Sequence, residues 1–143
     1  MSAQLALFGE RPKGKATRYA EAFLAKNPWV YDAFRHHALA LIETRERKRY
    51  SGMTIVNMIR WHDPRKTATD GLPMKFRIGN HTASFLSRMF LMEFPQHRSF
   101  FDLKPAEADY WPGPPGWEFS GTPVRAKDDD RPEPSWYYRG PAE

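Results

Sequence analysis

The fold is decided by the stretch YSGMTIVNMIRWHDPRKTATDGLPMKFRIGNHTASFLSRMFLMEFPQHRSFF, residues Tyr50–Phe101. Its apolar residues first recur at helical spacing, from about Met53 to His62. Ser51 stands just before them and is a good N-cap. A loop with two prolines and a glycine follows over residues 63–73. The first half of the stretch therefore predicts a capped helix and an exposed loop.

The second half predicts a strand, a helix and another strand. Lys75–Ile78 alternates charged and apolar residues, which is typical of a strand with one buried face. Asn80 is expected to cap a helix from His81 to about Phe94, which Pro95 ends. Ser99–Leu103 is expected to be a closing strand that pairs with Lys75–Ile78. The stretch thus predicts a small two-stranded ribbon beside helices.

Two more helices are predicted upstream. Thr17–Lys26 has its apolar residues near one side, and Asn27 followed by Pro28 predicts the start of a second helix that runs to about Arg45. We expect a mainly α (α+β) fold, a small helical domain with a short two-stranded ribbon, in which a winged-helix-like arrangement is one form. The predicted parts are a flexible arm (1–16), a basic helical domain (17–104) and an acidic, Pro- and Trp-rich tail (105–143).

Length and composition limit the class of protein. The chain has 143 residues and no cysteine, which suits one domain in a reducing cytosol. It has no apolar run that could span a bilayer and no signal-peptide pattern at its start. We expect a soluble protein in the cytoplasm of a bacterial host cell, without a membrane partner.

The net charge of +5 is unevenly distributed. Residues 1–104 hold 18 Lys and Arg against 9 Asp and Glu, whereas residues 105–143 hold 4 against 8. The first part therefore carries +9 and the second −4. A surface this basic attracts polyanions such as DNA, and the acidic tail is able to compete with them.

The N-terminal segment Gln4-Leu5-Ala6-Leu7-Phe8 is followed by Gly9, Pro12 and Gly14, so it is not the first turn of a long helix. It resembles the bacterial sliding-clamp-binding motif. The resemblance implies that Gln4 caps the peptide by hydrogen bonds while Leu7 and Phe8 fill a hydrophobic pocket on the clamp, with Leu5 beside them. The alternative is an edge strand that packs Leu5, Leu7 and Phe8 on the protein's own core.

A second resemblance is carried by six short segments: Ile59-Arg60-Trp61, Phe76-Arg77-Ile78, Gly79-Asn80, Arg88-Met89-Phe90, Pro95 and Phe100-Phe101. They resemble a family of small uncharacterised proteins encoded by bacteriophages, prophages and bacterial genomes. The resemblance covers about residues 23–103 and transfers no activity. It implies a mobile-element context, in which a clamp-binding peptide would have a use. Gly79-Asn80 stands where an Asn-Asn pair is expected, which leaves the helix cap intact.

A double-stranded DNA surface is predicted from polar and basic residues near the last helix. Asn and Arg read adenine and guanine edges, and Ser and His suit smaller contacts. The candidates are Arg47, Lys48, Arg49, Lys75, Arg77, Asn80, His81, Ser84 and Arg88, with Ser87 on the same exposed side. The alternatives are an ordinary bundle with a polar face and, for residues 45–49, cations that only complement a helix dipole.

The tail has eight prolines and four glycines in residues 105–143, so it cannot fold alone. Its aromatic residues are expected to fold back over the domain, because exposed Trp is a liability, although docking a partner is the alternative.

No catalytic motif is recognised. Adjacent His36 and His37 point in different directions on a helix, and His62-Asp63 is a weak metal-phosphohydrolase signal without further ligands. No phosphate-binding loop or nucleophile elbow is present in the sequence. We expect no enzyme, metal or cofactor; a nuclease or phosphatase built on His62-Asp63 is the enzymatic alternative.

Overall fold

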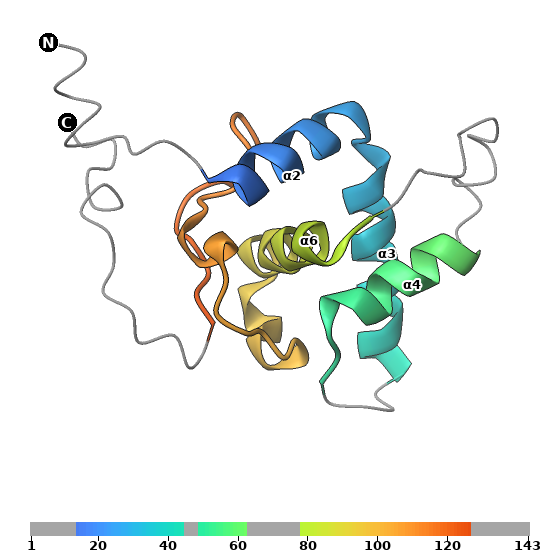
Figure 1. The fold of residues 1–143 in the computed structure, drawn as a ribbon. Coiled ribbons are helices and arrows are strands. Elements are labelled where there is room, and N and C mark those ends of the chain that lie inside the picture. The colour runs from blue at the N-terminus through green and yellow to red at the C-terminus, as the bar shows by residue number, and fades with distance from the viewer. Residues whose placement is uncertain (1–13, 45–48, 63–77, 127–143) are drawn as a thin grey trace, which may run out of the picture.

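The computed structural model describes residues 14–44, 49–62 and 78–126, with the backbone alone for 61 and 62. The elements follow in the order α2 (Lys15–Lys26), α3 (Trp29–Thr44), α4 (Gly52–His62), α6 (Asn80–Glu93) and the two 3-10 helices η1 (Pro95–Phe100) and η2 (Glu107–Tyr110) (Figure 1). None of these helices is long and apolar enough to cross a membrane. The prediction of a small, mainly helical domain is confirmed.

Helix α6 lies at the centre of the described residues, with α2, α3 and α4 around it (Figure 1). Nine of its fourteen residues are buried, on all sides of the helix. A helix that is buried all round belongs to the interior rather than to the surface. The sequence predicted an amphipathic helix with an exposed polar side, and that prediction is corrected for most of its length.

Helices α2 and α3 meet at Asn27 and Pro28. The Asn27 side-chain amide donates to the Phe23 carbonyl at 3.0 Å, and its backbone N–H donates to the same carbonyl at 2.9 Å. The Asn27 carbonyl then accepts from Val30 N–H at 3.0 Å. The helix break was predicted correctly, but the Asn27 side chain caps the end of α2 instead of the start of α3.

Helix α4 begins as the sequence predicts. Ser51 Oγ accepts a hydrogen bond from Thr54 N–H at 3.3 Å, which satisfies a backbone donor of the first turn. Gly52 brings this end of α4 close to α6, because a Cβ at Gly52 would lie 2.9 Å from the Ala83 carbonyl oxygen and closer still to Ser87 Oγ. The close approach of the two helices therefore needs glycine at position 52.

The predicted ribbon is not seen in the described part of the chain. Residues Pro95–Phe100 form η1, and Phe101 makes a single parallel bridge with Tyr50. Phe100 and Phe101 are adjacent and both buried, at 6% and 0% exposure. Consecutive strand residues point to opposite faces, so a ribbon with one buried face could not bury both. Lys75–Arg77, the rest of the other predicted strand, lies outside the described residues.

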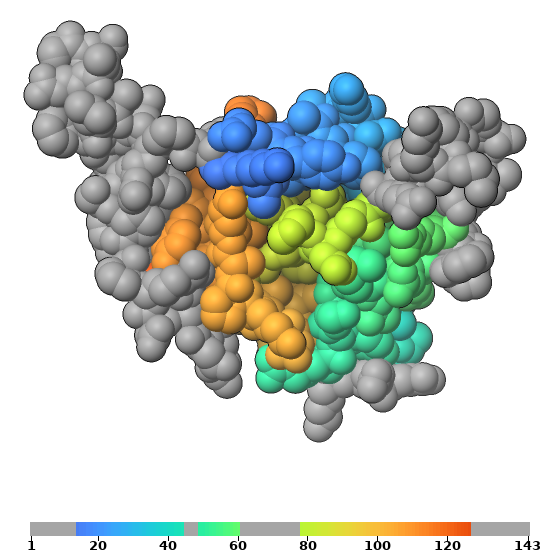
Figure 2. All heavy atoms as spheres, viewed as in Figure 1, coloured from blue at the N-terminus to red at the C-terminus, as the bar shows by residue number. Residues whose placement is uncertain are grey.

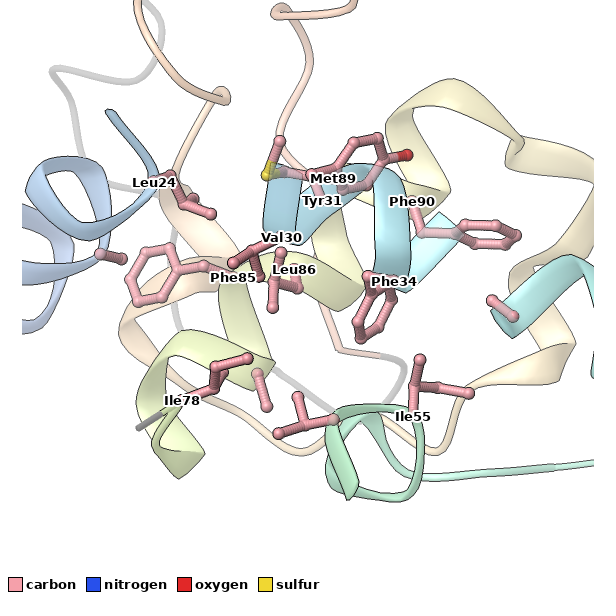
Figure 3. Close-up of a cluster of buried hydrophobic side chains, with 14 of the residues drawn as sticks. Leu24, Val30, Tyr31, Phe34, Ile55, Ile78, Phe85, Leu86, Met89 and Phe90 are labelled. Atoms are coloured by element: carbon pink, nitrogen blue, oxygen red, sulfur yellow. The ribbon is translucent and has the colours of Figure 1, made fainter. Parts of the chain in front are cut away.

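Within the described residues, the core is formed by helices α2, α3, α4 and α6 (Figure 3). Phe85, Leu86, Met89 and Phe90 project from α6 into this cluster. Phe101 stacks on Phe34 with ring centroids 5.8 Å apart and meets Phe90 edge-on at 5.6 Å. Aromatic pairs in these geometries add to the energy of burial.

Residues 105–126 fold back on the helical domain. In Figure 2 the segment that follows η1 lies against α2 and α6. Trp111 is 2% exposed, meets Phe85 edge-on at 4.9 Å and donates from Nε1 to Glu21 at 2.8 Å. Folding back was predicted from the tail's aromatic residues and is confirmed for residues 105–126.

Candidate functional site

The predicted DNA-reading face of α6 is exposed only in its first turn. Asn80 and His81 are exposed, and Gly79, in an extended conformation, occupies the N-cap position expected for Asn80. Further along the helix, Ser87 is buried and its Oγ donates to the Ala83 carbonyl at 3.0 Å. The expectation of an exposed Ser87 is therefore wrong.

The structure most clearly contradicts the prediction for Arg88. It was expected on the exposed side of the last helix, but its side chain is 1% exposed and forms an ion pair with Asp109, which is fully buried. Its Nη1 donates to Ser84 Oγ at 2.8 Å, and its Nη2 to the Lys104 carbonyl at 3.0 Å. The returning segment after η1 covers this side of α6. Arg88 therefore holds the fold together and is not placed to read a base edge.

Arg49 is exposed and pairs with Asp102, with Nη2 and Oδ1 3.4 Å apart. Ser84 is half-buried, and its Oγ accepts a hydrogen bond from Arg88 Nη1. The remaining predicted contacts lie outside the described residues; these are Arg47, Lys48, Lys75 and Arg77 for nucleic acid and Gln4, Leu5, Leu7 and Phe8 for the clamp. The structure thus exposes three of the predicted nucleic-acid residues that it describes: Arg49, Asn80 and His81.

A groove that the sequence did not predict opens along one side of α2. It encloses about 740 Å³, within the range of about 300–1,000 Å³ typical of ligand sites. The buried floor is formed by Leu24, Tyr31 and Met89 (labelled in Figure 3), and the rim carries charged side chains. Among the described residues, the lining is Arg18, Glu21, Ala22, Leu24, Ala25, Pro28, Tyr31, Asp32, Met89, Pro114, Pro115 and Trp117.

The far wall of the groove is a tight turn. The Pro114 carbonyl accepts from Trp117 N–H at 3.1 Å, and Gly116 has a φ of +78°. Proline followed by glycine at the two central positions is the signature of a type II turn, whose second central residue needs a positive φ. The turn presents Trp117, whose ring meets Tyr31 edge-on with centroids 5.3 Å apart. The Pro115-Gly116 pair was the sequence signal for this turn. The sequence did not show that the turn lies across the groove from Tyr31.

Tyr31 is fixed at the floor of the groove by a polar network. Its hydroxyl donates to Glu93 Oε1 at 2.7 Å, while Arg35 Nη1 donates to Glu93 Oε2 at 3.0 Å. Burial, and then the hydrogen bond to the Glu93 carboxylate, raise the pKa of the Tyr31 hydroxyl above its usual range. The hydroxyl therefore stays protonated and serves as a donor that orients the ring.

The histidine pair of α3 forms an aromatic contact. The rings of His36 and His37 meet edge-on, with centroids 5.2 Å apart. Across residues 14–44, 49–62 and 78–126, no three His, Asp or Glu side chains are grouped so as to hold a metal ion. The predicted His62-Asp63 pair falls outside this description, since Asp63 and the His62 side chain are not described.

No protein-family model, curated protein or solved structure matches the chain.

Proposed function

We propose that this protein binds the bacterial DNA polymerase sliding clamp through Gln4-Leu5-Ala6-Leu7-Phe8. The observation that carries the proposal is the peptide itself: glutamine, leucine, a small residue, then leucine and phenylalanine, in the order that resembles the clamp-binding motif. Leu7 and Phe8 are the anchors that fill the clamp pocket. A few apolar anchors in a preformed pocket carry most of the affinity of such a peptide.

The position of the peptide in the chain supports the proposal. The first described helix, α2, begins at Lys15, so the peptide precedes the helical domain with five residues between Phe8 and Gly14. The start of α2 is fixed from the other end of the chain, because Glu107 accepts hydrogen bonds from Thr17 N–H, at 3.0 Å, and from Thr17 Oγ1. A motif attached to a fixed helix by a short linker has the placement that capture by a partner requires.

By occupying the pocket that polymerases and repair proteins use, the protein inhibits or redirects host replication. The resemblance to phage and prophage proteins agrees with this role. The excess of basic residues before position 105 would add contact with DNA close to the clamp, since counterion release favours cationic surfaces on a duplex.

A calorimetric titration of the full chain into a bacterial sliding clamp tests the proposal. Binding is expected for the wild type and for an Ala6→Ser control, because position 6 tolerates variation in the motif. Binding should be lost in a Leu7→Ala/Phe8→Ala double variant. Equal affinity of the wild type and the double variant would end the proposal.

The charge asymmetry supports a second candidate, a sequence-specific DNA-binding regulator in which the peptide is structural. It predicts binding to duplex DNA that weakens steeply with salt and is reduced by Arg77→Ala. Lys26→Ala, at the end of α2, is the matched control. A flat salt response or no binding at low salt would exclude it. Arg88→Ala is not a suitable test, because Arg88 is buried in an ion pair.

A further inference from the structure

We propose that the groove between α2 and the Pro114–Trp117 turn is an intramolecular docking site for Leu7 and Phe8 of this chain's own N-terminal arm. The same two side chains would then be shared between the groove and the sliding clamp, so that the clamp must compete with the groove. The competition rests on the proposed function; the docking itself does not.

The surface of the groove suits apolar anchors. Leu24, Tyr31 and Met89 make its floor and are 7%, 5% and 3% exposed. Ala22 and Ala25 of α2 are exposed on one wall, and their short side chains leave the space open. A cavity of about 740 Å³ with this lining accepts a leucine and a phenylalanine side chain together.

The length of the arm matches the position of the groove. Six Cα–Cα steps join Phe8 to Gly14, and an extended chain covers at most about 3.6 Å a residue, or about 22 Å in total. Ala22 and Ala25 lie eight and eleven residues after Gly14, about 12 and 16 Å along a helix that rises about 1.5 Å a residue. Phe8 therefore reaches either position if the linker runs back along α2.

Charges at the rim complement the linker. Residues 9–13 contain Arg11 and Lys13, and the groove is bordered by the carboxylates of Glu21 and Asp32. Glu21 is held in place by the Trp111 indole N–H at 2.8 Å, and the Asp32 side chain is 57% exposed. Arg18 also lines the groove, and Asp32 pairs with Arg35 at 3.7 Å, so the two carboxylates outnumber the one guanidinium of the lining and favour a basic linker over an acidic one.

Docking would lower the apparent clamp affinity by the fraction of molecules in which the arm is free. If the arm is free in about one molecule in ten, the apparent dissociation constant rises about tenfold. The groove therefore lowers the apparent affinity for the clamp, and any change that blocks the groove raises that affinity.

The first experiment uses no clamp. Methyl NMR spectra of the full chain are compared with those of the Leu7→Ala/Phe8→Ala variant. The methyl signals of Ala22, Ala25 and Met89 should shift, while that of Ala40, exposed on α3 away from the groove, should not. Unchanged groove signals would overturn the docking, whatever the clamp does. The groove signals of the wild type could instead change on dilution and be the same in the wild type and the variant. That result would show that a second copy of the chain binds the groove, and it would also overturn the docking.

The second experiment adds the clamp. Ala25→Lys places a long cation in the groove, and Ala40→Lys is the matched control on an exposed helix position. Ala25→Lys should bind the clamp several-fold to about tenfold more tightly than the wild type, and Ala40→Lys should not. Equal clamp affinities would overturn the competition. Shifted methyl signals without any clamp binding would preserve the docking and reject the proposed function, so the two failures are distinguishable.

Discussion

Arg88 and Asp109 form a buried ion pair, with Nη2 and Oδ1 2.5 Å apart and side-chain exposures of 1% and 0%. Asp109 also accepts from Ala106 N–H and Ala126 N–H, each at 2.9 Å. One carboxylate thus joins the central helix, η2 and the last described residue. This arrangement ties the returning segment to the helical domain, and it removes Arg88 from the candidates for DNA contact.

Asp109→Ala is expected to lower the free energy of unfolding by about 3–5 kcal/mol, because it leaves a buried guanidinium without its carboxylate. Chemical denaturation followed by circular dichroism measures this loss. Arg49→Ala is the control: its pair with Asp102 has side chains 48% and 62% exposed, and such surface pairs contribute about 0–1 kcal/mol. Similar losses in the two variants would contradict the account of the buried pair.

Tyr31→Phe is expected to cost about 1–2 kcal/mol near neutral pH, because Glu93 loses a hydrogen-bond donor. The pKa of Tyr31 is raised above its usual value of 10.0, so its contribution is full below about pH 10 and falls as the pH rises further. The stability difference between wild type and Tyr31→Phe should therefore shrink above about pH 10, by up to about 1.4 kcal/mol per pH unit.

Tyr19→Phe, at a tyrosine 54% exposed on α2, is the control for the loss of a tyrosine hydroxyl. Near neutral pH it should change the free energy of unfolding by no more than about 0.5 kcal/mol, as most surface substitutions do. A Tyr31→Phe difference that does not change with pH would refute the account of Tyr31.

Gly52→Ala is expected to destabilise the protein by about 1–3 kcal/mol, as overpacking does in a tight interior. The added Cβ would meet the Ala83 carbonyl oxygen at 2.9 Å, and a backbone atom cannot move aside cheaply. Gly121→Ala is the control, since a Cβ there meets nothing within 4 Å. Thermal unfolding compares them; a harmless Gly52→Ala would show that α4 and α6 can separate at little cost.

The helices could be predicted from the sequence because their signals are local. Ser51 caps α4 as expected, Pro95 follows the end of α6, and the break at Asn27 and Pro28 separates α2 from α3. Fold-back of the tail followed from its aromatic residues, and Trp111 bears this out. In each case the residue type strongly favours one local role, such as capping a helix, ending a helix or burying an aromatic ring, so the prediction did not depend on distant contacts.

The failures concern contacts between segments distant in sequence. Arg88 was predicted on the surface because the helix was expected to pack through Phe85, Leu86 and Met89. Its partner Asp109 belongs to a segment that was predicted to be a tail. The prediction of a ribbon failed because Phe100 and Phe101 are both buried in the core, which two consecutive residues of a strand with one buried face could not be. The groove needs Ala25 and Trp117 on facing walls, which no local pattern reveals.

The central claim is tested most directly by competition for the clamp pocket. A fluorescent peptide carrying a polymerase clamp-binding motif is bound to the sliding clamp, and the full chain is added while anisotropy is recorded. The account predicts that the wild type displaces the peptide completely and that the Leu7→Ala/Phe8→Ala variant does not. Displacement by both proteins alike, or by neither, would contradict it.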